Sequence, residues 1–442
     1  MLEQITAALS ARDDLSAWSV RHVQSREVQL YAVPSAVESR RATSSERYLV
    51  QVLRRTAGPD GAEACGSGNA TLLPGDDIGA AIDAAALMAG LVQNRPHTIA
   101  GPAPLPDLPL ADQRIVDDPA VALDGLLDRL RGAVAAQPQL RLTAAELFAR
   151  TQLTHLCNSR GVDADQTETM IDMEWVVLRR AGDREVESFA ELSRRRVDDI
   201  KVEDIVAERA RRTADLLIAG APPDYRGAVV LRGETLATFL NAGVIETLAS
   251  AATRFNKLSR WEIGKPVFGG LPQGDPLNVF ANRRLPFGTR SSRFDDEGLP
   301  GLRVELIRDG RLAAFTASQR YADYLGVAPT GDMGNLELPA GATSAADLLA
   351  EPHVEIIAFS WFNPDTITGD FSSEIRLGYL VEGGRRTPFK GGALVGNVVD
   401  ALANVRWSAE TCFYGDYQGP TTARFGSLAV AGATTNSGGQ SA

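Results

Sequence analysis

The stretch TGDFSSEIRLGYLVEGGRRTPFKGG, residues 368–392, decides how the second half of this chain folds. From Phe371 to Val381, apolar side chains alternate with polar ones, as they do in a strand with one buried face. The pair Gly383-Gly384 then supplies a two-residue turn, because glycine adopts the positive φ angles that tight hairpins need. Strand-forming residues resume after the turn. The stretch therefore predicts a β-hairpin.

Lys390, which two glycines follow, raises a second possibility, a phosphate-binding loop. Such a loop needs the spacing GxxxxGK[ST] between a strand and a helix. The segment PFKGGALVGN lacks that spacing, and no serine or threonine follows the lysine. We therefore favour the hairpin, with its second strand leaving through a glycine bend.

Strands and glycine turns dominate the chain from about residue 225, with one helix expected near residues 234–256. A second hairpin is predicted at residues 301–315, where Asp309-Gly310 forms a strong turn pair. The first half instead combines predicted helices and predicted strands. We expect strands at 26–35 and 45–56, a hairpin around 181–183, and helices at 1–11, at 75–94 with Asp76 or Asp77 as N-cap, at 117–137, and at 201–220 with Gly220 as its end.

These patterns predict an α+β fold, with a mixed α/β domain over residues 1–222 and a β-rich domain over 223–432. The proline-rich segment 95–113 has no periodicity, so we expect an extended connector inside the first domain. Residues 433–442, ATTNSGGQSA, are of low complexity and are expected to form a flexible tail.

The net charge of −11 argues against nonspecific binding to nucleic acid or to an anionic membrane. No uncharged run of about 18 apolar residues is present, and the N-terminus does not have the pattern of a signal peptide. The cysteines, Cys65, Cys157 and Cys412, are far apart and form no CxxC pair, which suits a reducing cytoplasm. We therefore expect a cytoplasmic protein that binds neither nucleic acid nor membrane.

The residues alone offer no complete active site. Among the four histidines, His22, His97, His155 and His353, none has a partner at helical metal-ligand spacing. His155 and Cys157 would share a face of a strand, but two ligands do not hold a zinc ion. The acidic run of Asp295, Asp296 and Glu297 could bind a hard cation, although an acidic turn that opens a strand is favoured by its spacing.

Four segments in order, taken together, resemble the TldD/PmbA (TldE) family of peptidase-complex subunits. They are NSRGVDADQTETMIDMEWVVLRR (158–180), RFDDEGLPGLRVELIRDGRLAAFTASQRYADYLG (293–326), GNLELPAGATSAADLLAE (334–351) and DTITGDFSSEIRLGYLVEGGRRTPFKGGALVGNVVDAL (365–402). The first 100 residues match the family only in general pattern.

The resemblance implies two kinds of subunit, of which the TldD kind carries a helical HExxxH motif and a C-terminal cysteine around a catalytic zinc. The corresponding positions here are residues 233–238, where only Glu234 matches. Gly233 and Thr238 occupy the positions of the two histidine ligands, so no zinc site is expected in this chain. Cys412 lies roughly where the family has its cysteine. The chain thus looks like the metal-free PmbA/TldE kind.

The resemblance further implies a non-catalytic subunit whose TldD-like partner carries the zinc, in a complex that cleaves unfolded peptides or peptide conjugates, as in leader removal. An extended peptide could add as a strand to the β-rich half. The candidate contacts with substrate or partner, each of which could equally lie on an exposed strand or cap a turn, are Thr368, Asp370, Ser372, Ser373, Arg376 and Lys390. Two alternatives remain, a pure scaffold for the partner and an independent hydrolase that uses Asp295, Asp296 and Glu297.

Overall fold

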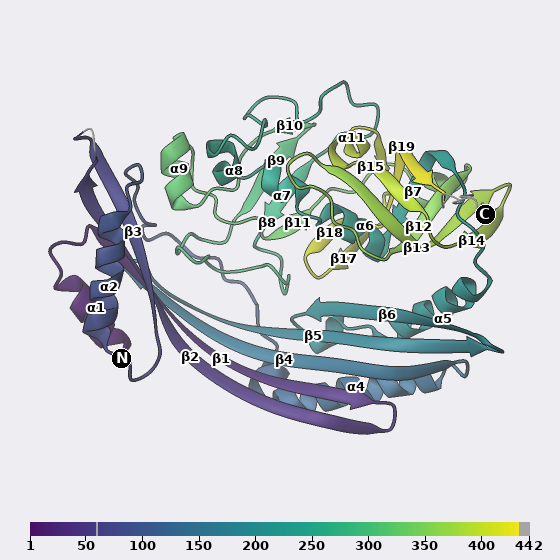
Figure 1. Ribbon diagram of the computed structural model, residues 1–442, viewed down its shortest axis with the longest axis horizontal. Coiled ribbons are helices and arrows are strands. Elements are labelled where there is room, and N and C mark those ends of the chain that lie inside the picture. The colour runs from purple at the N-terminus through teal and green to yellow at the C-terminus, as the bar shows by residue number, and fades with distance from the viewer. Residues whose placement is uncertain (59–60, 433–442) are drawn as a thin grey trace, which may run out of the picture.

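The computed structural model describes residues 1–58 and 61–432, and it shows the expected α+β fold (Figure 1). A long, curved sheet is built from the first half of the chain, and two further sheets are built from residues 225–431. The chain therefore leaves the first sheet and begins the other two near residue 222, but the division into two domains stays a prediction. Residues 433–442, the predicted tail, lie outside the described residues.

The first sheet is antiparallel throughout and has the strand order β3-β2-β1-β4-β5-β6. Its strands are β1 (Ala17–Val33), β2 (Ala36–Ala57), β3 (Glu63–Leu72), β4 (Leu140–Asn158), β5 (Asp163–Ala181) and β6 (Arg184–Arg194). The strands predicted at 26–35 and 45–56 are much too short. Residues 36–46 of β2 are exposed on both faces, apart from Glu46's intermediate exposure, so they carry no alternation that could reveal the strand.

Helices cover the convex side and the far end of this sheet (Figure 1). They are α1 (Leu2–Ser10), α2 (Ile78–Leu91), α3 (Gln113–Asp117), α4 (Pro119–Ala135), the 3₁₀ turn η1 (Val197–Asp199) and α5 (Val202–Ile218). The Asp77 side chain caps α2, and Asp118 caps α4 ahead of Pro119, which is why both helix starts could be predicted. Leucines of α4 pack on Leu147, Met173 and Trp175 of the sheet.

Of two predicted features of the first half, the connector agrees with the structure and the end of helix α5 differs from it. Residues 95–112 contain no helix or strand, as expected of an extended connector. Helix α5, however, ends at Ile218 rather than at Gly220. Gly220 instead pairs with the C-terminal half, because its N–H donates to the carbonyl of Pro388 and its carbonyl accepts from the N–H of Lys390. Helix α5 is therefore joined directly to the second half of the molecule.

The second half forms two sheets, with orders β10-β9-β8-β11-β18-β17 and β12-β7-β19-β15-β13-β14, and β16 pairs with β19. The strands are β7 (Tyr225–Arg232), β8 (Val279–Asn282), β9 (Arg303–Arg308), β10 (Arg311–Leu312), β11 (Asn335–Glu337), β12 (His353–Phe359), β13 (Asp370–Glu382), β14 (Arg385–Phe389), β15 (Ala393–Asn397), β16 (Val405–Trp407), β17 (Thr411–Tyr414), β18 (Tyr417–Pro420) and β19 (Thr422–Ala431). They enclose one large apolar core around Phe239, Phe425 and Trp407.

Both hairpins predicted in the second half of the chain are confirmed. Strands β13 and β14 pair from Gly378↔Phe389 to Glu382↔Arg385, and Gly383 and Gly384 have φ angles of 56° and 76°. Asp309 and Gly310 between β9 and β10 likewise have positive φ angles, 48° and 70°. Two successive positive φ values match the right-handed twist of the strands, which explains why these dipeptides could be recognised.

The single helix predicted near 234–256 is wrong, because three short helices occupy that segment: α6 (Gly233–Leu240), α7 (Val244–Leu248) and α8 (Ala251–Phe255). Gly243, with φ at 86°, and the extended Ser250 break the helix between them. The remaining helices are α9 (Gln319–Leu325), α10 (Ala345–Leu348) and α11 (Val398–Leu402).

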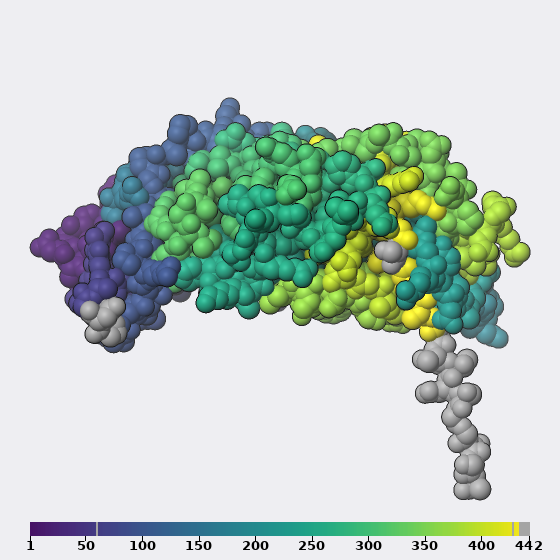
Figure 2. Space-filling model, turned by 90° about the horizontal axis from the view of Figure 1, so that it is seen from above, coloured from purple at the N-terminus to yellow at the C-terminus, as the bar shows by residue number. Residues whose placement is uncertain are grey.

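The two halves are stacked, with the C-terminal half lying over the concave side of the first sheet (Figures 1 and 2). Seen from above, residues of the C-terminal half make up most of the surface, and α1 and α2 lie at one end. Within the described residues, we find no helix with the length and apolar character needed to cross a bilayer.

Candidate functional site

A groove runs between the first sheet and the C-terminal half. Four adjoining cavities of about 420, 380, 570 and 500 Å³ make up this groove, and neighbouring cavities share lining residues. Glu234 lines three of them, while Arg150, Met170 and Thr289 line both of the last two. Glu234 is therefore at the centre of the candidate site.

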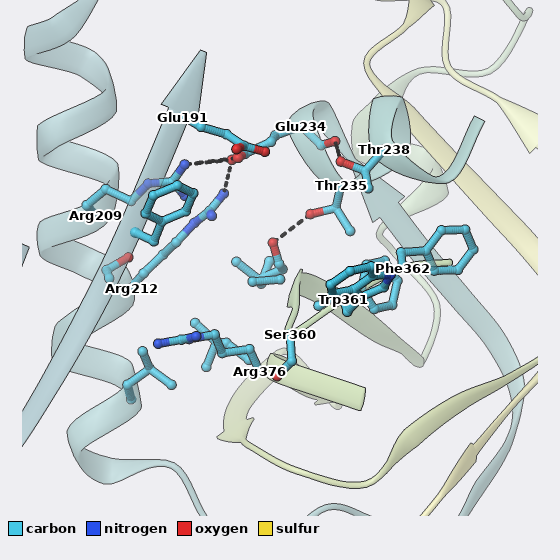
Figure 3. Close-up of a pocket in the computed structure, with 17 residues that line it drawn as sticks. Glu191, Arg209, Arg212, Glu234, Thr235, Thr238, Ser360, Trp361, Phe362 and Arg376 are labelled. Carbon is cyan, nitrogen blue, oxygen red and sulfur yellow. Dashed lines mark hydrogen bonds and ion pairs between the residues drawn. The ribbon is translucent and has the colours of Figure 1, made fainter. Parts of the chain in front are cut away.

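Glu234 is held by two arginines of α5 (Figure 3). It lies in the first turn of α6, directly after β7. Arg209 donates to both carboxylate oxygens at 3.0 and 2.9 Å, and Arg212 donates to one of them at 3.1 Å. The two arginine side chains are only 3% and 11% exposed, whereas that of Glu234 is 39% exposed. This ion-pair cluster fastens the N-terminal half to the C-terminal half.

The flanking positions do not offer the ligands that the HExxxH pattern would supply. Gly233 has a φ angle of 51°, and a Cβ at this position would lie 2.8 Å from the hydroxyl oxygen of Tyr414. The hydroxyl of Thr238 donates to the backbone carbonyl of Glu234 at 2.9 Å. With no imidazole at either position and with the Glu234 carboxylate bound to arginines, these residues do not fit a zinc ion.

Cys412 on β17 does lie near this place, because it lines the same cavity as Gly233, Glu234 and Tyr414. Burial raises the pKa of its thiol to about 11, so the sulfur is protonated at neutral pH. A thiol must lose its proton to ligate a metal. The position matches the resemblance, but the side chain here behaves as a small, partly buried neutral group.

The histidines are likewise engaged elsewhere. Nε2 of His22 lies 2.8 Å from Glu46, and Nε2 of His155 lies 2.6 Å from Asp163. Nδ1 of His97 and of His353 lies near a backbone carbonyl. Over residues 1–58 and 61–432, no group of three or more His, Cys, Asp or Glu side chains is placed to hold a metal ion.

The three carboxylates of the acidic turn point to different partners. Asp295 accepts from the N–H groups of Glu297 and Leu299 and pairs with Arg283 at 3.2 Å. Asp296 pairs with Arg21, and Glu297 accepts from the N–H of Gln319 at 2.7 Å. The prediction of an acidic turn therefore describes this segment better than the prediction of a shared cation site.

Among the six predicted contact residues, only Arg376 lines any of the four cavities, and it lines the one of about 380 Å³. Thr368 and Asp370, the first residue of β13, are exposed, and the Asn397 side chain donates to the carbonyl of Thr368 and to the carboxylate of Asp370. Ser372 and Ser373 are adjacent on β13 and face opposite sides, and Ser373 is buried. Lys390 is exposed beyond the end of β14. The structure thus does not gather the six into one site.

Several residues of the groove could not be found from the sequence. Arg209 and Arg212 read as part of a solvated, charged helix. Glu191 on β6 lies directly across from Glu174 on β5 and has no ion-pair partner among the described residues. Burial, followed by the charges of Glu174 and Glu234, raises the pKa of Glu191. Trp361, which follows β12, is 72% exposed at the rim of the cavity of 380 Å³.

Comparisons with known proteins agree with the resemblance. Residues 225–432 match the model of the PmbA/TldA metallopeptidase C-terminal domain. A metalloprotease of Synechocystis is 31% identical over 32% of this chain and 34% of its own length, and the metalloprotease PmbA of Escherichia coli O157:H7 is 26% identical over 52% of this chain and 51% of its own length. The C-terminal half of the chain belongs to the TldD/PmbA family.

The likeness in fold extends over the whole chain. The crystal structure of TldE from Thermococcus kodakarensis superposes with a TM-score of 0.80 over 98% of this chain and all of that one. At 16% identity, that likeness shows a shared fold alone. The sequence matches cover about a third of the length of one of these two curated relatives and about half of the other. The C-terminal segment 365–402, on which the resemblance partly rests, lies within the residues that the family model matches.

Proposed function

We propose that this chain is the metal-free subunit of a heteromeric zinc peptidase of the TldD/PmbA family. One observation carries the proposal: the positions that would bind zinc hold Gly233 and Thr238, and the remaining Glu234 is bound by Arg209 and Arg212. A glutamate neutralised by two buried arginines is poorly placed to take a proton from a metal-bound water. Its role in this chain is structural.

The groove supports a role in holding an extended peptide. It is continuous past Glu234, and β6, which borders it, is the last strand of its sheet. An edge strand presents main-chain N–H and C=O groups that a peptide can pair with whatever its sequence. This mode suits a complex that cleaves unfolded peptides or peptide conjugates, such as a peptide precursor that loses its leader.

The partner would be a TldD-like chain with an intact HExxxH motif, and it would supply the zinc. We expect the complex to work in the cytoplasm, where the free thiols of Cys65, Cys157 and Cys412 would stay reduced. A scaffold that never touches the substrate is less well supported, because the groove is open and a charged side chain, Arg376, faces it without a partner among the described residues.

Co-expression with a TldD-like chain tests the pairing. We expect the two chains to co-purify and to hydrolyse an unfolded protein such as casein only when both are present. A partner variant with its HExxxH glutamate replaced by glutamine serves as the control for activity of the partner's zinc site. If no complex forms and the activity never depends on both chains, the proposal is wrong.

A further inference from the structure

The cavity of about 380 Å³ next to Glu234 has walls from both halves of the molecule. Phe189 of β6 and Leu216 of α5 come from the first half, and Phe359, Trp361 and Phe362 come from the end of β12 and the segment after it. Phe189 and Trp361 are 45% and 72% exposed, so both present aromatic surface to a ligand in the cavity. Aromatic walls around a few polar groups, at this volume, are typical of a ligand pocket.

Arg376 is the arginine of this cavity that has no ion-pair partner among the described residues. It projects from the exposed face of β13, and within residues 1–58 and 61–432 its guanidinium makes no hydrogen bond or ion pair. Arg209 and Arg212 on the same cavity are already bound to Glu234. A guanidinium offers parallel N–H donors that match the two oxygens of a carboxylate.

The charges around the cavity also favour one orientation of a bound ligand. In Figure 3, Glu191 and Glu234 lie together on one side, and Arg376 lies on the other, with Trp361 and Phe362 along the wall between them. Glu191 has no cationic partner among the described residues, so an anion would be repelled at its side of the cavity. Arg209 and Arg212 already share the Glu234 carboxylate, so Arg376 is the guanidinium of this cavity that a ligand carboxylate can bind.

We propose that this cavity binds the C-terminal residue of a peptide, with the α-carboxylate on Arg376 and an apolar or aromatic side chain against Phe189 and Trp361. This inference rests on the proposed function, since it takes peptides as the substrates of the complex. It adds that the metal-free chain recognises one end of the peptide by itself. A peptide held in this way enters the groove towards Glu191 with its main chain.

Trp361 provides the readout in the isolated chain. Of the five tryptophans, Trp175, Trp261 and Trp407 are at most 4% exposed and Trp18 is partly buried, so a ligand in the cavity acts mainly on the emission of Trp361. The probes are acetyl-Gly-Leu-Phe with a free carboxylate and the same peptide as a carboxamide. We expect the carboxylate form to shift and change the emission and to bind at least about tenfold more tightly than the amide.

Two variants assign the effect to this site. Arg376→Gln should weaken binding of the carboxylate form to the level of the amide, while leaving the amide unchanged. Arg385→Gln is the matched control, because Arg385 is an exposed arginine of the same hairpin that does not line the cavity. Trp361→Phe should remove the fluorescence change but keep the heat of binding in calorimetry.

Equal affinity for the acid and the amide, or carboxylate binding that survives Arg376→Gln in a folded chain, would overturn the inference. An absence of any binding by fluorescence and by calorimetry would overturn it as well. Because these measurements use the chain without its partner, their outcome is separate from the co-expression test. Carboxylate-dependent binding in a chain that forms no complex would refute the proposed function and leave the subsite standing.

Discussion

Replacing Glu234 by alanine tests whether this residue now serves as a connection between the two halves of the molecule. The change removes the counter-ion of Arg209 and Arg212, which stay 3% and 11% exposed. Among the described residues, no other ion pair neutralises Arg209, whereas Arg212 keeps Glu208 on the previous turn of α5. The variant should therefore lose stability through one uncompensated, buried guanidinium.

The burial of the cluster sets the size of the effect. Breaking a fully buried ion pair costs about 3–5 kcal/mol, and breaking an exposed one costs about 0–1 kcal/mol. The arginines are buried but the Glu234 side chain is 39% exposed, so solvent screens part of the interaction. We expect Glu234→Ala to lower the free energy of unfolding by about 1–3 kcal/mol.

Urea denaturation followed by circular dichroism measures this effect, with a check that the slope of the transition is unchanged. The matched control is Glu185→Ala, which removes the exposed pair with Arg180, where the side chains are 39% and 67% exposed, and should cost less than about 0.5 kcal/mol. A double-mutant cycle with Arg209→Ala gives the coupling energy directly. If Glu234→Ala costs no more than the control and the coupling energy is zero, the cluster does not join the halves.

Two further predictions concern single side chains. Burial, and then the charges of Asp295 and Asp332, raise the pKa of Glu297 to about 7. The folded state therefore favours the protonated carboxyl, and this contribution to stability is fully present below about pH 4.5 and is lost as the pH rises through 7. Glu297→Gln should therefore gain about 1–3 kcal/mol relative to wild type between pH 5 and pH 9 in urea denaturation, and an unchanged pH dependence would contradict this. Gly233→Ala should cost about 1–2 kcal/mol, since φ is 51° and the new Cβ meets Tyr414. Gly132→Ala in the last turn of α4, where the new Cβ meets nothing within 4 Å, should instead stabilise, and a similar effect at both sites would be evidence against the strain at Gly233.

The elements that could be predicted from the sequence are those set by local chemistry. Gly383-Gly384 and Asp309-Gly310 tolerate positive φ angles, so each of these dipeptides predicts the turn of a hairpin. Asp77 and Asp118 accept from free N–H groups at the starts of α2 and α4. In each case, the cause and its effect lie within four residues of each other in the chain.

The groove depends instead on contacts between distant segments. Arg209 and Glu234 are 25 residues apart, and the long outer half of β2 is a strand because it pairs with β1, although its own residues show no buried face. The helix predicted at 234–256 is interrupted at Gly243. The family resemblance points to residues 233–238, but only the tertiary structure shows that Glu234 is bound by α5.

The zinc content and activity of the purified chain test the central claim most directly. The chain should be loaded with zinc at neutral pH, desalted, and analysed for bound metal and for hydrolysis of an unfolded protein, alone and together with a TldD-like partner. We predict far less than one zinc ion per copy of this chain and no hydrolysis by it alone, with one zinc per partner and activity in the complex. One tightly bound zinc ion per chain, together with hydrolysis in the absence of a partner, would contradict the account.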